Sequence, residues 1–282
     1  MNKFFFLFIL INIHIANCFK STFLTPEQFN YRNRHNKIIT ISPAGLAGFY
    51  LLGIVKYIKE NYDISDYTIL GASAGAWNSI PLVYKHDINY ITSDLIDNYC
   101  NIIDYNLLNY NDEDTDEDTD DCKISSIYQL QCNIKSILIN NYSKNDFNLN
   151  KINIATTVFT KSGFKQIIIS DIKSLEQATD SCFASSHIPF ITGNLLLKVD
   201  DKLFFDGGLK GFPPENIKPY FSITPDIWGF KFTDYFKIPN FNKKNSVGNP
   251  VNDIDIMSFE NLLEKGYDDS RENRKVLDEF FD

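Results

Sequence analysis

The sequence predicts an α/β fold: a mainly parallel central sheet with helices on both faces, arranged as three α/β/α layers. Two observations predict it. Short apolar runs typical of buried strands alternate with helix-like segments, in the order strand, turn, helix. The chain has 282 residues, of which 44% are hydrophobic, which is enough for one large domain with a substantial core.

The first strand and helix are predicted between residues 37 and 60. Lys37–Ser42 is a short apolar run that ends before Pro43, as expected for a buried strand. Apolar residues then recur at helical spacing from Phe49 to Ile58, and the helix is expected to end near Glu60.

A second strand, turn and helix follow directly. Tyr67–Leu70 is a short apolar strand that enters the glycine-containing turn Gly71–Gly75. We expect the next helix to begin near Ala74 and to end near Tyr84. The repeated order of elements is typical of parallel strands joined by helices.

The second half of the domain is predicted to contain a hairpin, a helix and two further strands. The hairpin joins Ile152–Phe159 to Lys165–Ser170 through a glycine turn. Ser174–Ser186 is expected to be helical, and Lys202–Phe205 to be a strand. Ile227–Phe232 is interpreted as the last strand, which gives one domain over residues 37–232.

Two segments differ from this pattern. Asn111–Asp121 consists almost entirely of Asp, Glu and Thr and is predicted to be a solvated acidic loop. A calcium site is the alternative, but the turn glycine of a calcium-binding loop is missing. Asp253–Phe281 is predicted to be a long amphipathic helix, broken at Gly266, that packs on or beside the domain.

The first 18 residues have the features of a secretory signal peptide. Lys3 provides a positive start, Phe4–Ile11 is apolar, and small residues precede Cys18. We therefore expect the protein to enter the secretory pathway or to be secreted; an uncleaved anchor is the alternative. Four cysteines then remain, which permits two disulfides, and Cys122 and Cys132 are close enough in sequence to close a small loop.

Charge and cysteine spacing argue against two kinds of function. The formal net charge of -9 argues against nucleic acid binding, which needs clustered Lys and Arg, and against docking on anionic membranes by charge alone. The cysteines have no metal-site spacing, so no metal is assigned.

The strongest local motif is Gly71–Ala72–Ser73–Ala74–Gly75, which has the Gly-x-Ser-x-Gly form and lies between a predicted strand and a predicted helix. A serine nucleophile in such a sharp turn needs small neighbours, because larger side chains would collide. The helix N-terminus also favours developing negative charge. Ser73 is therefore the candidate nucleophile.

The candidate base is less obvious. His187 is the one histidine whose place in the sequence fits a Ser–His–Asp triad, but an α/β-hydrolase has its acid between serine and histidine. Asp206, the best acid candidate, follows His187 instead. This order counts against an α/β-hydrolase.

Four segments, in order, resemble the patatin-like phospholipase family, in which a Ser–Asp dyad replaces the triad. Between residues 37 and 211 they are the loop Ser42–Gly48, the elbow Gly71–Gly75, the stretch Ala184–Pro189 and Asp206–Gly207–Gly208. The resemblance implies a patatin-like fold and a serine-dependent hydrolase of lipid carboxylic esters, of the phospholipase A or acylglycerol lipase type. It also implies a lipid substrate, transient contact with a membrane or lipid-droplet surface, and no cofactor.

The resemblance also assigns the residues. Ser73 would attack the ester and Asp206 would act as its base, with Gly71 and Gly75 supporting the elbow. Gly207 and Gly208 would let the aspartate turn approach the serine. The oxyanion hole would be formed by the backbone of Ala44, Gly45 and Leu46.

This chain departs from the family in its oxyanion loop, where Ala44 replaces a glycine and Ala47 replaces a basic residue. Two alternatives follow from the departures and from the histidine. One is a non-catalytic relative that binds lipid. The other is a Ser–His–Asp hydrolase of small esters that uses His187. The oligomeric state does not follow from the sequence.

Overall fold

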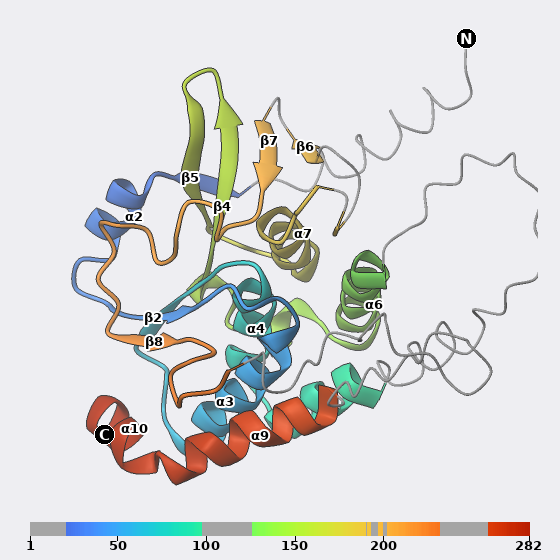
Figure 1. Cartoon of the computed structure of the whole chain (residues 1–282), viewed down its shortest axis with the longest axis vertical. Coiled ribbons are helices and arrows are strands. Elements are labelled where there is room, and N and C mark those ends of the chain that lie inside the picture. Colours follow the sequence, from blue (N-terminus) through green and yellow to red (C-terminus); the bar gives the residue numbers. More distant parts are fainter. Residues whose placement is uncertain (1–20, 98–125, 190, 193–196, 200–201, 232–258) are drawn as a thin grey trace, which may run out of the picture.

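The computed structural model describes residues 21–97, 126–189, 191–192, 197–199, 202–231 and 259–282. It confirms the predicted α/β class: helices flank a central sheet whose inner strands are parallel (Figure 1). The strands are β1 (Thr22–Leu24), β2 (Lys37–Ile41), β3 (Tyr67–Gly71), β4 (Ile152–Thr160), β5 (Gly163–Ser170), β6 (Leu197–Val199), β7 (Lys202–Phe205) and β8 (Phe221–Ile223). The helices include α2 (Pro26–Arg32), α3 (Gly48–Asn61), α4 (Ala74–Leu82), α6 (Ser126–Asn141), α7 (Leu175–Ser185), α9 (Phe259–Glu272) and α10 (Arg274–Phe281).

The main path through the sheet runs β1-β5-β4-β3-β2-β8. Strands β8, β2, β3 and β4 are parallel to one another, whereas β5 runs antiparallel to β4 as the second strand of a hairpin. The parallel strands all end at one edge of the sheet. Loops at that edge are the usual place for a functional site in an α/β fold.

Strand β4 is long, and its two halves pair with different strands along one side. Ile152–Ile154 pairs with β3, and Thr157–Phe159 pairs with β7, which runs in the opposite direction. The other side of β4 is taken by β5. Strands β3 and β7 therefore end facing each other beside β4.

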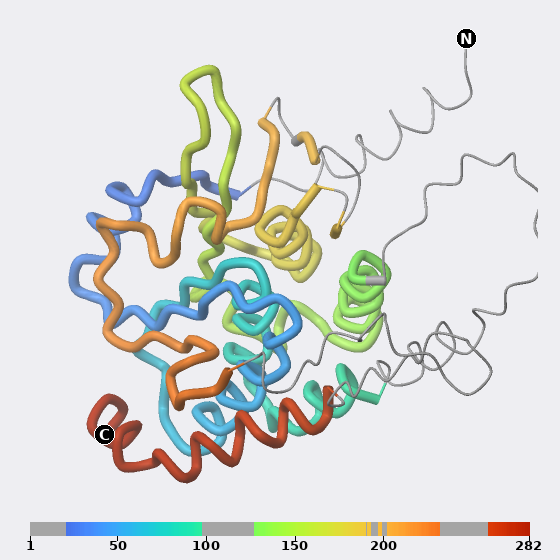
Figure 2. Tube along the Cα trace, viewed as in Figure 1, coloured from blue at the N-terminus to red at the C-terminus, as the bar shows by residue number. Residues whose placement is uncertain are grey.

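The two faces of the sheet are covered differently. Alternation along β2 places Ile39 and Ile41 in the larger core, against α3, α4 and α7, while Ile38 points to the opposite face. There Ile38 and Leu70 pack against Phe29 of α2 and against Ile217 of the segment after β7. Figure 2 shows this segment running back across the sheet toward β8.

The last strand is not where the sequence predicted it. Residues 225–229 form a turn, in which Gly229 has φ +79° and donates its N–H to Asp226 O at 2.9 Å; residues 230–231 are in neither helix nor strand. The strand is β8, which pairs in parallel with β2. The prediction failed because Trp228 and Phe230 are apolar for another reason: they pack on helices, Phe230 stacking on Tyr50 at 4.0 Å.

The break in the C-terminal helical segment was also misplaced. Helix α9 continues through Gly266 and ends at Glu272, with Asn273 between it and α10. Gly266 is required by helix packing, because a Cβ atom there would lie 2.0 Å from the carbonyl oxygen of Tyr50 on α3. Gly53 of α3 approaches α9 in the same way. The glycine marks a close contact between α3 and α9 rather than a helix end.

Several predictions lie outside the described residues: the signal peptide at 1–18, the acidic loop at 111–121 and the start of the C-terminal segment before 259. Where the chain is described, no helix combines the length and the apolar character needed to span a membrane. Cys132 and Cys182 are free thiols, and Cys122, the partner considered for Cys132, lies outside the described residues.

Candidate active site

The Gly-x-Ser-x-Gly segment forms a sharp turn between β3 and α4. Ser73 lies directly before the first residue of α4 and has φ +53° and ψ -124°, in a region that non-glycine residues rarely adopt. Such strain is kept where the surrounding structure enforces it, and it is common at functional positions. Ser73 is nevertheless buried to 7% exposure at one end of a cavity.

The glycines of this turn are required by space. A Cβ atom on Gly71 would lie 2.4 Å from both the carbonyl oxygen of Gly75 and the hydroxyl of Ser79. A Cβ atom on Gly75 would lie 2.0 Å from the carbonyl oxygen of Ile41. Neither position accepts a side chain unless the backbone moves, as the sequence motif predicted.

Strand pairing explains why Asp206 is close to Ser73, although the two residues are 133 positions apart in the sequence. Strand β3 ends opposite Ile154, and β7 ends opposite Thr157 on the same side of β4. The two strand ends are therefore only about 10 Å apart along β4. A Cβ atom on Gly207 would lie 3.0 Å from the Cβ of Ala72, so the two turns are in contact.

Ser185, at the end of α7, holds these turns together. Its hydroxyl accepts the N–H of Ser73 at 2.8 Å and donates to the carbonyl oxygen of Ala155 at 2.6 Å. Its own carbonyl oxygen accepts the N–H of Gly207 at 2.7 Å. One residue thus links the elbow, the aspartate turn and β4.

The carboxylate of Asp206 is half-buried, and its two oxygens have different surroundings. Oδ1 accepts the N–H of Gly208 at 2.7 Å. Oδ2 is buried, and no described residue makes a hydrogen bond of ordinary geometry to it. The Ser73 hydroxyl nevertheless interacts with the carboxylate. Catalytic hydrogen bonds are often long or misaligned until substrate binds, so this contact is compatible with a nucleophile and its base.

Burial is the main influence on the pKa of Asp206. It raises the pKa above the usual aspartate value, because it disfavours the charged form. The nearby Ser73 hydroxyl and the hydrogen bond from the Gly208 N–H lower the pKa but do not cancel the effect of burial. The carboxylate is therefore a stronger base than an exposed aspartate.

The predicted oxyanion loop lies beside the serine. Gly45 and Leu46 line the cavity together with Ser73, whereas Ala44 does not. Gly45 has φ +53°, and Ala44 has φ -147°, which alanine adopts without strain. No described residue accepts the backbone N–H of Gly45 or Leu46. The structure thus brings two of the three predicted donors to the site, and the substitution at Ala44 does not strain the loop.

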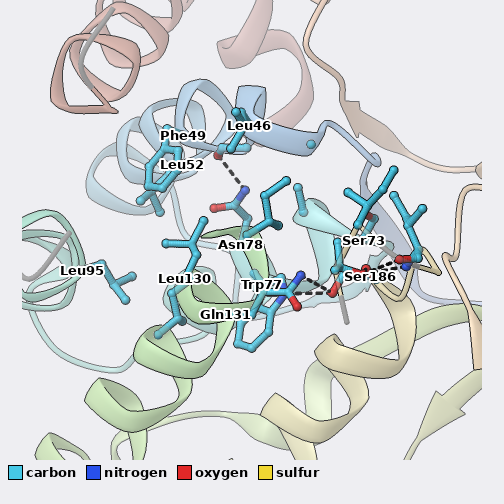
Figure 3. A pocket seen from close by; sticks show the side chains of 18 of the residues that line it. Leu46, Phe49, Leu52, Ser73, Trp77, Asn78, Leu95, Leu130, Gln131 and Ser186 are labelled. Carbon is cyan, nitrogen blue, oxygen red and sulfur yellow. Dashed lines mark hydrogen bonds between the residues drawn. The ribbon is translucent and has the colours of Figure 1, made fainter. Parts of the chain in front are cut away.

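The cavity has a volume of about 150 Å³ and an apolar lining. It extends from Ser73 to Leu95, between the start of α3, α4, α6 and the loop after α7 (Figure 3). Leu130, Ile134 and Leu138 of α6 form one wall. The sequence analysis missed α6, although apolar residues at 127, 130, 134 and 138 have helical spacing that would have predicted it.

Two polar side chains, from α4 and α6, line the cavity. Trp77 Nε1 and Gln131 Nε2 both donate to the Ser186 hydroxyl, at 3.2 and 3.0 Å, and that hydroxyl donates to Cys182 O (Figure 3). Trp77 thus lines the cavity.

His187 is placed differently from its neighbours. Ser186 and Ile188 line the cavity, whereas His187 between them does not. Its side chain is buried, with its ring centroid 6.5 Å from that of Phe205, and its carbonyl oxygen accepts the N–H of Asp206 at 2.8 Å. This placement favours Asp206 over His187 as the partner of Ser73.

Comparison with known proteins finds only distant structural similarity. No protein-family model matches the chain, and no curated protein matches it by sequence. Among solved structures, it is similar to a chain of the heterodimeric ExoU-SpcU complex from the type III secretion system of Pseudomonas aeruginosa. The identity is 10% and the TM-score 0.33; the match covers 86% of this chain and 52% of the other, so this chain spans about half the length of that neighbour.

Proposed function

We propose that this protein is a serine-dependent hydrolase of lipid carboxylic esters, with Ser73 as nucleophile and Asp206 as general base. One observation carries the proposal: a strained serine at the end of an apolar cavity and a half-buried aspartate belong to two turns that are in contact. The resemblance of four sequence segments to patatin-like phospholipases supports the same assignment.

In the acylation step, Ser73 Oγ attacks the ester carbonyl carbon and transfers its proton to the Asp206 carboxylate. The carbonyl oxygen becomes negative and accepts the free N–H groups of Gly45 and Leu46. The ester C–O bond then breaks, and the leaving alcohol takes the proton from Asp206. The acyl group remains on Ser73.

In the deacylation step, Asp206 removes a proton from water, whose oxygen attacks the acyl carbon. The same N–H groups stabilise the oxyanion. The bond to Ser73 Oγ breaks, the serine takes back the proton from Asp206, and the free acid leaves. The raised pKa of Asp206 serves both steps, because the carboxylate must take up and return a proton at each one.

The cavity supports a lipid as the substrate class. Its lining is mostly apolar and includes Leu52, Leu95 and Leu138. The Asn78 side chain, which also lines it, is engaged by its donation to Gly48 O at 2.9 Å. An acyl chain of several carbons fits such a space, and its burial contributes about 0.8 kcal/mol per methylene. Water-soluble esters with short chains would gain less.

The test is hydrolysis of a lipid-ester mixture, read by mass spectrometry, with wild-type protein, Ser73→Ala and Asp206→Asn. We expect each variant to lose at least about 10³-fold in kcat, because each removes one member of a pair that acts together. Asp66→Asn, a change at an exposed carboxylate, is the matched control and should behave as wild type.

Two further measurements separate the alternatives. A fluorophosphonate probe should label wild-type protein at Ser73 and leave Ser73→Ala unlabelled; absence of the adduct in folded wild type would favour a lipid-binding protein without catalysis. His187→Ala should retain turnover. Its complete loss, in protein that remains folded, would favour a Ser–His–Asp hydrolase.

A further inference from the structure

Exposed apolar side chains are concentrated near the catalytic edge of the sheet. Among the described residues, nine large hydrophobic side chains are exposed, and five of them lie on three segments that meet at Asp206. These five are Phe159 (45% exposed), Phe164 (42%), Ile188 (39%), Ile191 (49%) and Leu209 (55%). Side chains that gather at one place are typical of an interaction site, whereas scattered ones are not.

The hairpin of β4 and β5 carries the two phenylalanines beyond the end of the neighbouring parallel strand β3. Strand β3 ends opposite Ile154, but β4 continues six residues further, to Thr160, or about 20 Å (Figure 1). Phe159 and Phe164 are cross-strand partners whose rings lie 5.0 Å apart. Phe164 also contacts Phe205, the residue before Asp206, at 5.1 Å. The exposed rings are thus continuous with the candidate site.

The three aliphatic side chains surround the catalytic turns. Ile188 and Ile191 line the cavity and are also exposed to solvent, so they lie at its entrance. Leu209 stands on the turn closed by its own N–H, which donates to Asp206 O at 3.1 Å. The hairpin, the entrance loop and the aspartate turn are neighbours, because the Phe205 ring lies 5.1 Å from the Phe164 ring and 6.5 Å from the His187 ring.

The charge on these segments is positive. Lys161 and Lys165 lie on the hairpin beside the two phenylalanines, and Lys210 follows Leu209; all three are exposed. Within the described part of the chain, none of them takes part in a salt bridge with Asp or Glu. The carboxylate of the same segments is Asp206, which is half-buried. The surface therefore combines apolar side chains with free ammonium groups.

This local charge is compatible with the acidic composition. The chain has 27 basic and 36 acidic residues, but eight of the acidic ones lie between Asp112 and Asp121. The remaining sequence is therefore close to neutral. A positively charged surface at this edge is therefore compatible with the nearly neutral charge of the chain outside residues 112–121.

We propose that Phe159, Phe164, Ile188, Ile191 and Leu209, with Lys161, Lys165 and Lys210, form a docking surface for a phospholipid bilayer that contains anionic lipids. The apolar side chains enter the boundary between headgroups and acyl chains, and the lysines contact lipid phosphates. The cavity entrance then opens onto the lipid. This inference rests on the proposed function for its purpose, but the binding itself is testable without catalysis.

The test measures binding of the full-length Ser73→Ala protein to vesicles by flotation, with phosphatidylcholine alone and with phosphatidylcholine and phosphatidylglycerol at 3:1. Phe159→Ser/Phe164→Ser should lower the partition coefficient at least tenfold on both vesicles. Lys161→Gln/Lys165→Gln should lower it several-fold on the anionic vesicles only, and added salt should have the same effect. The matched control is Tyr31→Ser/Tyr90→Ser, which removes two exposed aromatic residues elsewhere and should change binding less than twofold.

Equal binding by the phenylalanine double variant and the control, or no vesicle binding by any protein, overturns the proposal. So does a dimer in solution that dissociates in the phenylalanine double variant, since the surface would then belong to a second copy. With Ser73 intact, this double variant should keep turnover of a soluble short-chain ester within twofold and lose turnover on vesicles. If wild type hydrolyses no ester at all, the proposed function fails, while vesicle binding still decides the docking surface.

Discussion

The proposed nucleophile elbow and the proposed oxyanion loop both contain glycine, but for different physical reasons. In the elbow, Gly75 has no room for a side chain, because a Cβ atom would lie 2.0 Å from the carbonyl oxygen of Ile41. In the loop, a Cβ atom on Gly45 would meet nothing within 4 Å, and the residue is glycine because its φ is +53°. In the elbow, lack of space excludes any side chain at Gly75. In the loop, the positive φ of Gly45 favours glycine.

This difference explains why one motif is intact and the other is not. A crowded position cannot change without moving the backbone of a neighbouring strand. In the loop, the residue with positive φ is Gly45, which is retained, whereas the substituted residue Ala44 has φ -147°, outside the left-handed region that favours glycine. The alanine in the loop is therefore no sign that the site has decayed. Substitutions in the two regions should fail in different ways.

The largest effect is expected for Gly75→Ala. The new Cβ atom would overlap the Ile41 carbonyl oxygen, so β2 and α4 would have to separate. We expect the free energy of unfolding to fall by more than about 4 kcal/mol, which approaches the whole stability of a typical domain. Urea unfolding followed by circular dichroism checks this, and a loss below about 1 kcal/mol would contradict the crowding.

Ser185→Ala should have the next largest effect. It leaves the buried N–H of Ser73 without its acceptor and removes the bond to Ala155 O. An unsatisfied buried group costs about 1–3 kcal/mol. The stability should fall by that amount, and kcat should fall more than KM changes, because the elbow loses its support. Ser185→Thr, which restores a hydroxyl, should recover part of kcat; equal kcat in wild type and Ser185→Ala would remove this residue from the site.

Gly45→Ala should affect the reaction rather than the fold. The left-handed conformation costs alanine about 1–2 kcal/mol, so the loop either keeps φ +53° with that strain or turns its N–H away. Loss of one oxyanion donor lowers kcat by about 10²–10³-fold. We expect a fall of about 10- to 100-fold with a melting temperature within a few degrees of wild type. Unchanged kcat would place the oxyanion hole elsewhere.

The dependence of kcat/KM on pH should come from Asp206 and not from the oxyanion loop, because residues Ala44 to Gly48 contain no ionisable side chain. Asp206 must be ionised to accept the serine proton, and burial raises its pKa above the usual 3.8. The value of kcat/KM should therefore be full above the raised pKa and fall tenfold per pH unit below it. A pH–rate profile on a soluble ester checks this. Gly45→Ala should lower the whole profile without moving its acidic limb.

The sequence predicts some parts of the candidate site better than others. The elbow, its strand and its helix could be predicted, because Gly-x-Ser-x-Gly between an apolar run and a helical pattern is a local signal. The meeting of Ser73 with Asp206 is not local. It depends on β3 and β7 sharing one side of β4, and only the family resemblance pointed to it.

The remaining errors arose where an apolar or glycine signal had a tertiary cause. Trp228 and Phe230 are apolar because they pack against helices. Position 266 is glycine because α3 passes too close for a side chain. The wall of the cavity on α6 was missed next to the acidic run, although its apolar spacing was present. Local patterns predict elements well, but which neighbour an element contacts is decided by the whole sheet.

Ala44→Gly should have the smallest effect and decides whether the departure from the family loop matters. Because Ala44 already has an unstrained φ and does not line the cavity, glycine adds no donor to the site. It increases the freedom of the unfolded chain, which costs about 0.5–1 kcal/mol, and removes a methyl group that packs against the core. We expect stability to fall by about 1 kcal/mol and kcat to stay within twofold. A rise in kcat of tenfold or more would mean that alanine does impair the oxyanion loop, because only a relaxed backbone could then have improved the donors.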